Sequence, residues 1–133
     1  MKGADVINVS WGGPDSLFGR DAVKAALDLG ALLVVSAGNG TGVSPEGINI
    51  DKNLLYPAAY ERVLVVGSTE KNSDAKADFS NFGVGVDVFA PGVLLNSTTP
   101  GNGYTSQANG TSFSTPLVAG LAALLKTRYP SWT

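Results

Sequence analysis

Three polar segments of this chain contain residues that could act together on a ligand: Ser10, Asn39 and Ser112. Ser112 lies in a Gly-Thr-Ser turn that leads into the apolar stretch Leu117–Leu125, which predicts a helix. Backbone N–H groups in the first turn of a helix have no partner within the helix and favour negative charge. A serine hydroxyl there, with an amide donor nearby, has the ingredients of acyl transfer through an oxyanion hole.

The first two polar segments each follow a short apolar run that predicts a strand, over Val6–Ser10 and Ala31–Ser36. A helix that begins after Asp15 or Ser16 and stops near Leu29 connects them. The apolar residues on one face of this helix are Phe18, Ala22, Ala25, Ala26 and Leu29. A strand, a helix and a strand in this order predict a βαβ unit with parallel strands. Ligands bind beyond the carboxyl ends of such strands, so the polar residues after both strands should face one crevice.

The rest of the chain predicts further strands and a closing helix. We expect a buried strand over Val63–Gly67, a short strand over Val86–Ala90 and a hairpin within residues 97–106. The closing helix starts near Thr111 and has no charged residue within Leu117–Leu125, so we expect it to be buried on nearly all sides. Together these elements predict an α/β fold with a parallel sheet and flanking helices.

Composition excludes several classes of protein. The 133 residues suffice for one domain, and the net charge of -2 gives no reason to expect nucleic acid or an anionic membrane as partner. No apolar run reaches membrane-spanning length. The absence of cysteine removes disulfides, thiolate zinc sites and cysteine nucleophiles. The absence of histidine removes the commonest general base for a serine nucleophile.

Each candidate residue also has a simpler interpretation. Ser112 alone could cap a helix, and Asn39 alone could be a turn residue between glycines. The glycines of residues 38–42 follow a strand, as they do in a dinucleotide-binding loop. Residues 43–47 do not continue as the helix that such a loop requires, so the sequence does not support nucleotide binding.

Several motifs together carry a resemblance to a known family. Asn109–Gly120 resembles the nucleophile motif of the subtilisin-like serine proteases, or subtilases. Ala4–Gly13 resembles the family's substrate-binding strand, and Val35–Asn39 resembles its oxyanion-hole segment. Four more similar segments follow in the family's order: Tyr56–Ala58, Val63–Ser68, Phe79–Gly83 and Asp87–Gly92. The resemblance covers essentially the whole chain and implies a subtilisin-like parallel sheet.

The resemblance also implies a role for each candidate residue. Ser112 would be the nucleophile, and the side-chain amide of Asn39 would stabilise the oxyanion beside the Ser112 backbone N–H. Five residues would contact the substrate. Ser10, Trp11 and Gly12 would pair with its backbone as an added strand, and Ala37 and Gly38 would line the pocket for the residue before the scissile bond.

The main departure from the family concerns the catalytic triad, whose order is Asp, His, Ser in subtilases. The chain has no histidine, and Asp5 and Asp87 are interpreted as structural because neither has a histidine to orient. Residues 1–133 therefore resemble the C-terminal part of a subtilase peptidase domain without its N-terminal strands. We expect the chain to be inactive as a protease alone, and the alternative function is a catalytically inactive scaffold that binds peptides or oligomerises.

The expected partners follow from the same resemblance. They are a peptide or protein substrate, together with the missing N-terminal half of the domain or further copies of the chain, because an open sheet edge recruits a partner. No cofactor is expected, although Asp87 and carbonyls near Tyr60 and Val63 resemble the surroundings of a weak cation site in some subtilases. A secreted or cell-surface location is expected only from the habits of the family.

Overall fold

The computed structural model describes residues 3–41 and 46–131. Residues 43–45, part of the segment that argued against nucleotide binding, lie outside this range. The elements follow the order β1 (Val6–Val9), α1 (Leu17–Asp28), β2 (Leu32–Ser36), β3 (Leu64–Thr69), β4 (Val88–Pro91), β5 (Leu95–Thr99), β6 (Gly103–Ala108) and α2 (Thr111–Arg128). The predicted strands and helices are all found, with ends shifted by a few residues.

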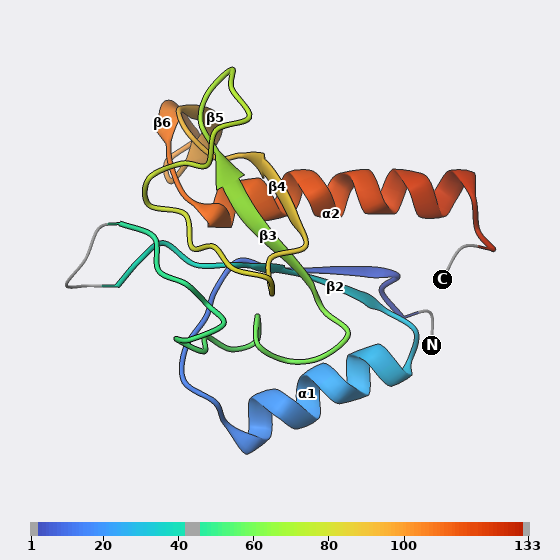
Figure 1. Ribbon diagram of the computed structural model, residues 1–133. Coiled ribbons are helices and arrows are strands. Elements are labelled where there is room, and N and C mark those ends of the chain that lie inside the picture. The colour runs from blue at the N-terminus through green and yellow to red at the C-terminus, as the bar shows by residue number, and fades with distance from the viewer. Residues whose placement is uncertain (1–2, 42–45, 132–133) are drawn as a thin grey trace.

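A four-stranded parallel sheet in the order β1-β2-β3-β4 forms the centre of the fold, and β5 and β6 make a separate antiparallel hairpin. Val9 of β1 lies opposite Val35 of β2, which in turn lies opposite Val65 of β3. Helix α1 covers one face of the sheet and α2 covers the other (Figure 1). This arrangement confirms the predicted α/β fold class.

Successive side chains of β2 point to opposite faces of the sheet and pack in the clusters on both sides. Leu33 and Val35 are buried in the cluster on the α1 side, whereas Val34 is buried with Val66 on the α2 side. A strand covered on both faces reads as a continuous apolar run, which is why the sequence pattern located it.

Helix α1 is capped by Ser16, one of the two residues predicted to precede it. The Ser16 hydroxyl accepts a hydrogen bond from the Gly19 backbone N–H at 3.0 Å. The expected apolar face is wrong, however, except at Ala26. Val23, Ala26 and Leu27 contact the sheet, whereas the Phe18 and Leu29 side chains are 86% and 87% exposed. The spacing of apolar residues predicted the helix correctly. It could not show which of two apolar faces, the one with Phe18 and Leu29 or the one with Val23 and Leu27, packs on the sheet.

The expectation that the closing helix is buried on nearly all sides is also wrong for the described residues. Only one side of α2 contacts the sheet, where Thr111, Ser114, Thr115 and Ala119 are buried. Four leucines are exposed on the rest of its surface: Leu117, Leu121, Leu124 and Leu125. The sequence shows that the helix is apolar all round, but no described segment forms a second layer over its outer side.

Strand β1 is an edge strand in the described part of the chain, because it pairs with β2 alone. No helix among the described residues is long and apolar enough to cross a membrane.

Candidate active site

Ser112 lies in the first turn of α2, directly against the end of β1. The Ser112 hydroxyl donates a hydrogen bond to the Ser10 backbone carbonyl at 3.2 Å. In return, the Ser10 hydroxyl donates to the Ser112 backbone carbonyl at 2.9 Å. These reciprocal bonds join residues that are 102 positions apart in the chain. The hydroxyl is half-buried and faces the backbone of the segment predicted to bind substrate.

Asn39 is held at the start of the same helix by Thr111. The side-chain oxygen Oδ1 of Asn39 accepts hydrogen bonds from the Thr111 backbone N–H at 2.9 Å and from its hydroxyl at 2.8 Å. The hydroxyl also accepts a bond from the Gly38 backbone N–H at 3.2 Å. Because the amide is planar, fixing Oδ1 directs Nδ2 away from Thr111. A Cβ atom on Gly110 would lie 3.1 Å from this Nδ2.

The Asn39 segment is fixed from its other side by Asn81, which is buried. Asn81 Nδ2 donates to the Ala37 backbone carbonyl at 2.8 Å, and Asn81 Oδ1 accepts from the Gly40 backbone N–H at 2.8 Å. The Asn81 backbone N–H donates to the Gly38 carbonyl at 3.0 Å. The turn that carries Asn39 is therefore bound by Asn81 at three positions on both sides of Asn39: Ala37, Gly38 and Gly40.

The residues predicted to contact substrate lie at the same edge of the sheet. Ser10 follows β1, and Ala37 and Gly38 follow β2. Trp11 is 65% exposed, and Ala37 is completely buried. The structure therefore brings all seven predicted site residues to one end of the sheet, with Asn39 and Ser112 joined through Thr111.

Sequence reasoning gave no role to Thr111 or Asn81, although both lie inside quoted motifs. Their function in the structure depends on hydrogen bonds to residues 72 and 44 positions away. Their sequence neighbours give no signal, because Thr111 stands between Gly110 and Ser112, and Asn81 stands between Ser80 and Phe82. Buried polar side chains need partners, but the sequence does not name them.

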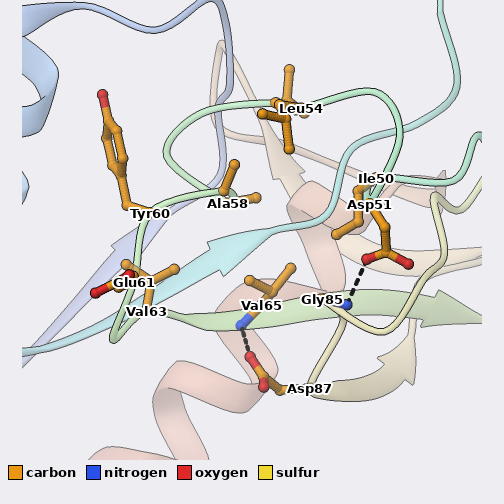
Figure 2. Close-up of a pocket in the computed structure, with 12 residues that line it drawn as sticks. Ile50, Asp51, Leu54, Ala58, Tyr60, Glu61, Val63, Val65, Gly85 and Asp87 are labelled. Atoms are coloured by element: carbon orange, nitrogen blue, oxygen red, sulfur yellow. Dashed lines mark hydrogen bonds between the residues drawn. The ribbon is translucent and has the colours of Figure 1, made fainter.

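A cavity of about 340 Å³ is lined by none of the seven predicted site residues, and three of its lining residues are acidic: Asp51, Glu61 and Asp87 (Figure 2). The Asp87 carboxylate accepts a hydrogen bond from the Val65 backbone N–H at 2.7 Å. The described residues contain no group of three or more His, Cys, Asp or Glu side chains that could hold a metal ion. The cation site expected near Asp87 also involves backbone carbonyls near Tyr60 and Val63, and it stays a prediction.

The groups with shifted pKa values lie away from Ser112, around the start and end of α1. Tyr60 donates a hydrogen bond to Asp15 at 2.8 Å, and this bond, with help from Arg20, holds the pKa of Asp15 below its ordinary value. Lys24 lowers the pKa of Asp28 in the same way. These carboxylates are ion-paired on the surface and are structural.

Comparison with known proteins identifies the family. The Subtilase family model matches residues 1–133, and the chain belongs to this family. Subtilisin BL of Lederbergia lenta is 43% identical over 133 residues, which are 99% of this chain and 45% of that protein. M-protease of Shouchella clausii (strain KSM-K16) is 43% identical over 134 residues, which are 99% of this chain and 32% of that protein. The chain therefore spans less than half the length of these relatives.

Solved structures show the same fold. A cold adapted subtilisin-like serine proteinase superimposes with a TM-score of 0.79 and 36% identity, over 92% of this chain and 41% of that one. The S218A mutant of the protease domain of PatA gives 0.80 and 34% identity, over 96% of this chain and 45% of that one. The fold is subtilisin-like.

Proposed function

We propose that these residues form the nucleophile and oxyanion side of a subtilisin-like serine endopeptidase. The observation that carries the proposal is the link through Thr111, which places the Asn39 amide beside the helix turn that holds Ser112. A nucleophile and a preorganised amide donor at one helix start are the arrangement that acyl transfer requires.

In the proposed reaction, Ser112 Oγ attacks the carbonyl carbon of the scissile peptide bond. The Oγ proton passes to a base, and the carbonyl oxygen becomes an oxyanion that accepts hydrogen bonds from Asn39 Nδ2 and the Ser112 N–H. Breakdown of this intermediate expels the amine, which takes up the proton, and leaves an acyl group on Ser112. Water then releases the acid and restores the hydroxyl.

The base must come from outside these residues, because the chain contains no histidine. Loss of the triad histidine lowers turnover by about 10⁶-fold, a value that was measured on subtilisin, a member of this family. We therefore propose that residues 1–133 are inactive alone and that a segment carrying the triad Asp and His completes the site. The unpaired edge of β1 and the exposed leucines of α2 give that segment, or a second copy, a surface to cover.

Substrate would enter along Ser10, Trp11 and Gly12, whose backbone follows the edge strand β1. The second candidate function uses the same segment without chemistry, as a scaffold that binds peptides or oligomerises. It is favoured by one observation, the absence of a histidine from a chain in which Thr111 fixes the Asn39 side chain.

Fluorophosphonate labelling, read by intact mass, separates the two functions. We would compare the 133-residue chain with a chimaera in which it replaces the matching part of Subtilisin BL. The protease proposal predicts one label on the chimaera and none on Ser112→Ala, while the exposed control Ser106→Ala stays labelled. A folded chimaera that is not labelled, or a label that survives Ser112→Ala, would contradict the proposal and favour the inactive scaffold.

A further inference from the structure

The Leu55 side chain fills the space between two glycines of the predicted substrate site. A Cβ atom on Gly12 would lie 2.9 Å from Leu55 Cγ, and a Cβ atom on Gly38 would lie 2.7 Å from Leu55 Cδ2. Both distances are shorter than real side chains tolerate, so the isobutyl group is packed against both glycine backbones. Leu55 therefore separates the segment after β1 from the segment after β2.

The backbone around Leu55 is anchored on both sides. Tyr56 exchanges two backbone hydrogen bonds with Gly13, at 2.8 and 3.0 Å. The Leu55 carbonyl accepts a further bond from the Ala59 backbone N–H at 2.9 Å. Since the anchor at Gly13 is next to Gly12, the Leu55 backbone cannot shift away from this gap without breaking the pairing with the substrate segment.

We infer that Leu55 determines specificity by closing the pocket for the residue before the scissile bond. This inference rests on the proposed function, in which Gly12 pairs with the substrate backbone and Gly38 lines that pocket. A substrate side chain directed between the two glycines meets the leucine methyl groups. Substrates with glycine, alanine or serine at this position fit, and those with large aliphatic or aromatic residues are rejected.

A larger space exists behind Leu55. Leu55 is also one wall of the cavity of about 340 Å³, whose other apolar walls include Ile50, Ala58 and Val63 (Figure 2). This volume is in the range of small-ligand pockets. Truncation of Leu55 would connect the cavity to the gap between the glycines, so a large side chain could then enter.

Binding of cleavage products tests the inference on the 133-residue chain itself, because it needs neither base nor acid. The probes are two tetrapeptides with free carboxylates, acetyl-Ala-Ala-Pro-Ala and acetyl-Ala-Ala-Pro-Phe, titrated into labelled protein and followed by amide chemical shifts. A misfit of even one methylene changes discrimination by about 10-fold or more. We expect the alanine peptide to bind at least about 10-fold more tightly than the phenylalanine peptide, with shifts at Gly38, Asn39 and Ser112.

Two variants locate the cause. Leu55→Ala should reduce the preference by about 10-fold or more. Leu17→Ala, the same truncation at a side chain that is 77% exposed and does not line the cavity, should leave the preference unchanged. The inference is overturned if both peptides bind at this site of the unaltered chain with equal affinity, or if the phenylalanine peptide binds more tightly. The proposed substrate site then still stands. Shifts by neither peptide at these residues overturn the proposed site and this inference with it. The unaltered chain alone decides the matter if Leu55→Ala does not fold.

Discussion

Thr111→Val removes the hydroxyl that connects the Asn39 amide to the start of α2, and it changes the side-chain volume little. The hydroxyl makes two contacts: it donates to Asn39 Oδ1 at 2.8 Å and accepts from the Gly38 N–H at 3.2 Å. Thr111 is completely buried, whereas Asn39 is exposed, so water can replace the contact to Asn39 Oδ1 more easily than the contact to the Gly38 N–H. Asn39 Oδ1 keeps only the backbone N–H of residue 111 as a donor.

The dominant cost is the Gly38 N–H left without a partner, about 1–3 kcal/mol of unfolding free energy. With the unfolding entropy typical of 133 residues, about 0.28 kcal/mol per kelvin, this lowers Tm by about 4–11 °C. Thr111→Ser keeps the hydroxyl and should recover most of this loss. In an active chimaera the Val variant should also label Ser112 more slowly. The upper limit is the roughly 10²–10³-fold effect of losing one oxyanion donor, a value that subtilisin itself supplies.

Thermal unfolding followed by circular dichroism measures the loss of Tm. The side-chain amide resonances of Asn39 report whether the Thr111 hydroxyl orders that amide. Ordering of the amide by the hydroxyl predicts that these resonances broaden or shift in Thr111→Val and stay in place in Thr111→Ser. If the Val and Ser variants have the same Tm and the same Asn39 resonances, the hydroxyl does not hold the amide, and the account of the oxyanion side fails.

Two further predictions concern the scaffold. Val66→Ala, at a residue with no exposed surface, should lower the unfolding free energy by about 2 kcal/mol. The same change at Val84, which is 94% exposed, should stay within about 0.5 kcal/mol; equal effects in urea unfolding would contradict the assigned core. The pKa of Asp15 is lowered mainly by the Tyr60 hydroxyl. Its stabilising contribution is therefore present at neutral pH and is lost as pH falls through the lowered pKa, below about 3.9. Asp15→Asn should make Tm decrease less steeply as pH falls in the acid range. An equally steep decrease of Tm in the variant and the unaltered chain would refute this.

The strands and helices could be predicted from the sequence because each has a strong local signal. The continuous apolar run of β2 and the Ser16 cap of α1 are examples. The side of each helix that packs on the sheet could not be predicted. Phe18 and Leu29 follow helical spacing as well as Val23 and Leu27 do, and a pattern cannot show which stripe the sheet covers.

The position of the site could be predicted for a topological reason. Parallel strands bring their carboxyl ends to one edge, so Ser10 and Asn39 were expected at the same end of the sheet once β1 and β2 were paired. The residues that fix the site could not be found this way. Thr111 and Asn81 act through bonds across the fold, and Leu55 acts through a contact with glycines of two other segments. None of these relations has a fixed spacing in the sequence.

The distribution of these bonds has a consequence for how the site is assembled. The groups that fix the Asn39 turn all belong to the described residues, since Thr111 and Asn81 supply its side-chain partners. An oxyanion donor contributes to catalysis because it is oriented before charge develops, so that no reorganisation is needed during the reaction. The proposed oxyanion side can therefore be preorganised without the triad Asp and His. A partner segment would have to add the base and position it against Ser112, but it would not have to build the oxyanion hole. Peptide binding by the 133-residue chain therefore tests this half of the site separately from the chemistry.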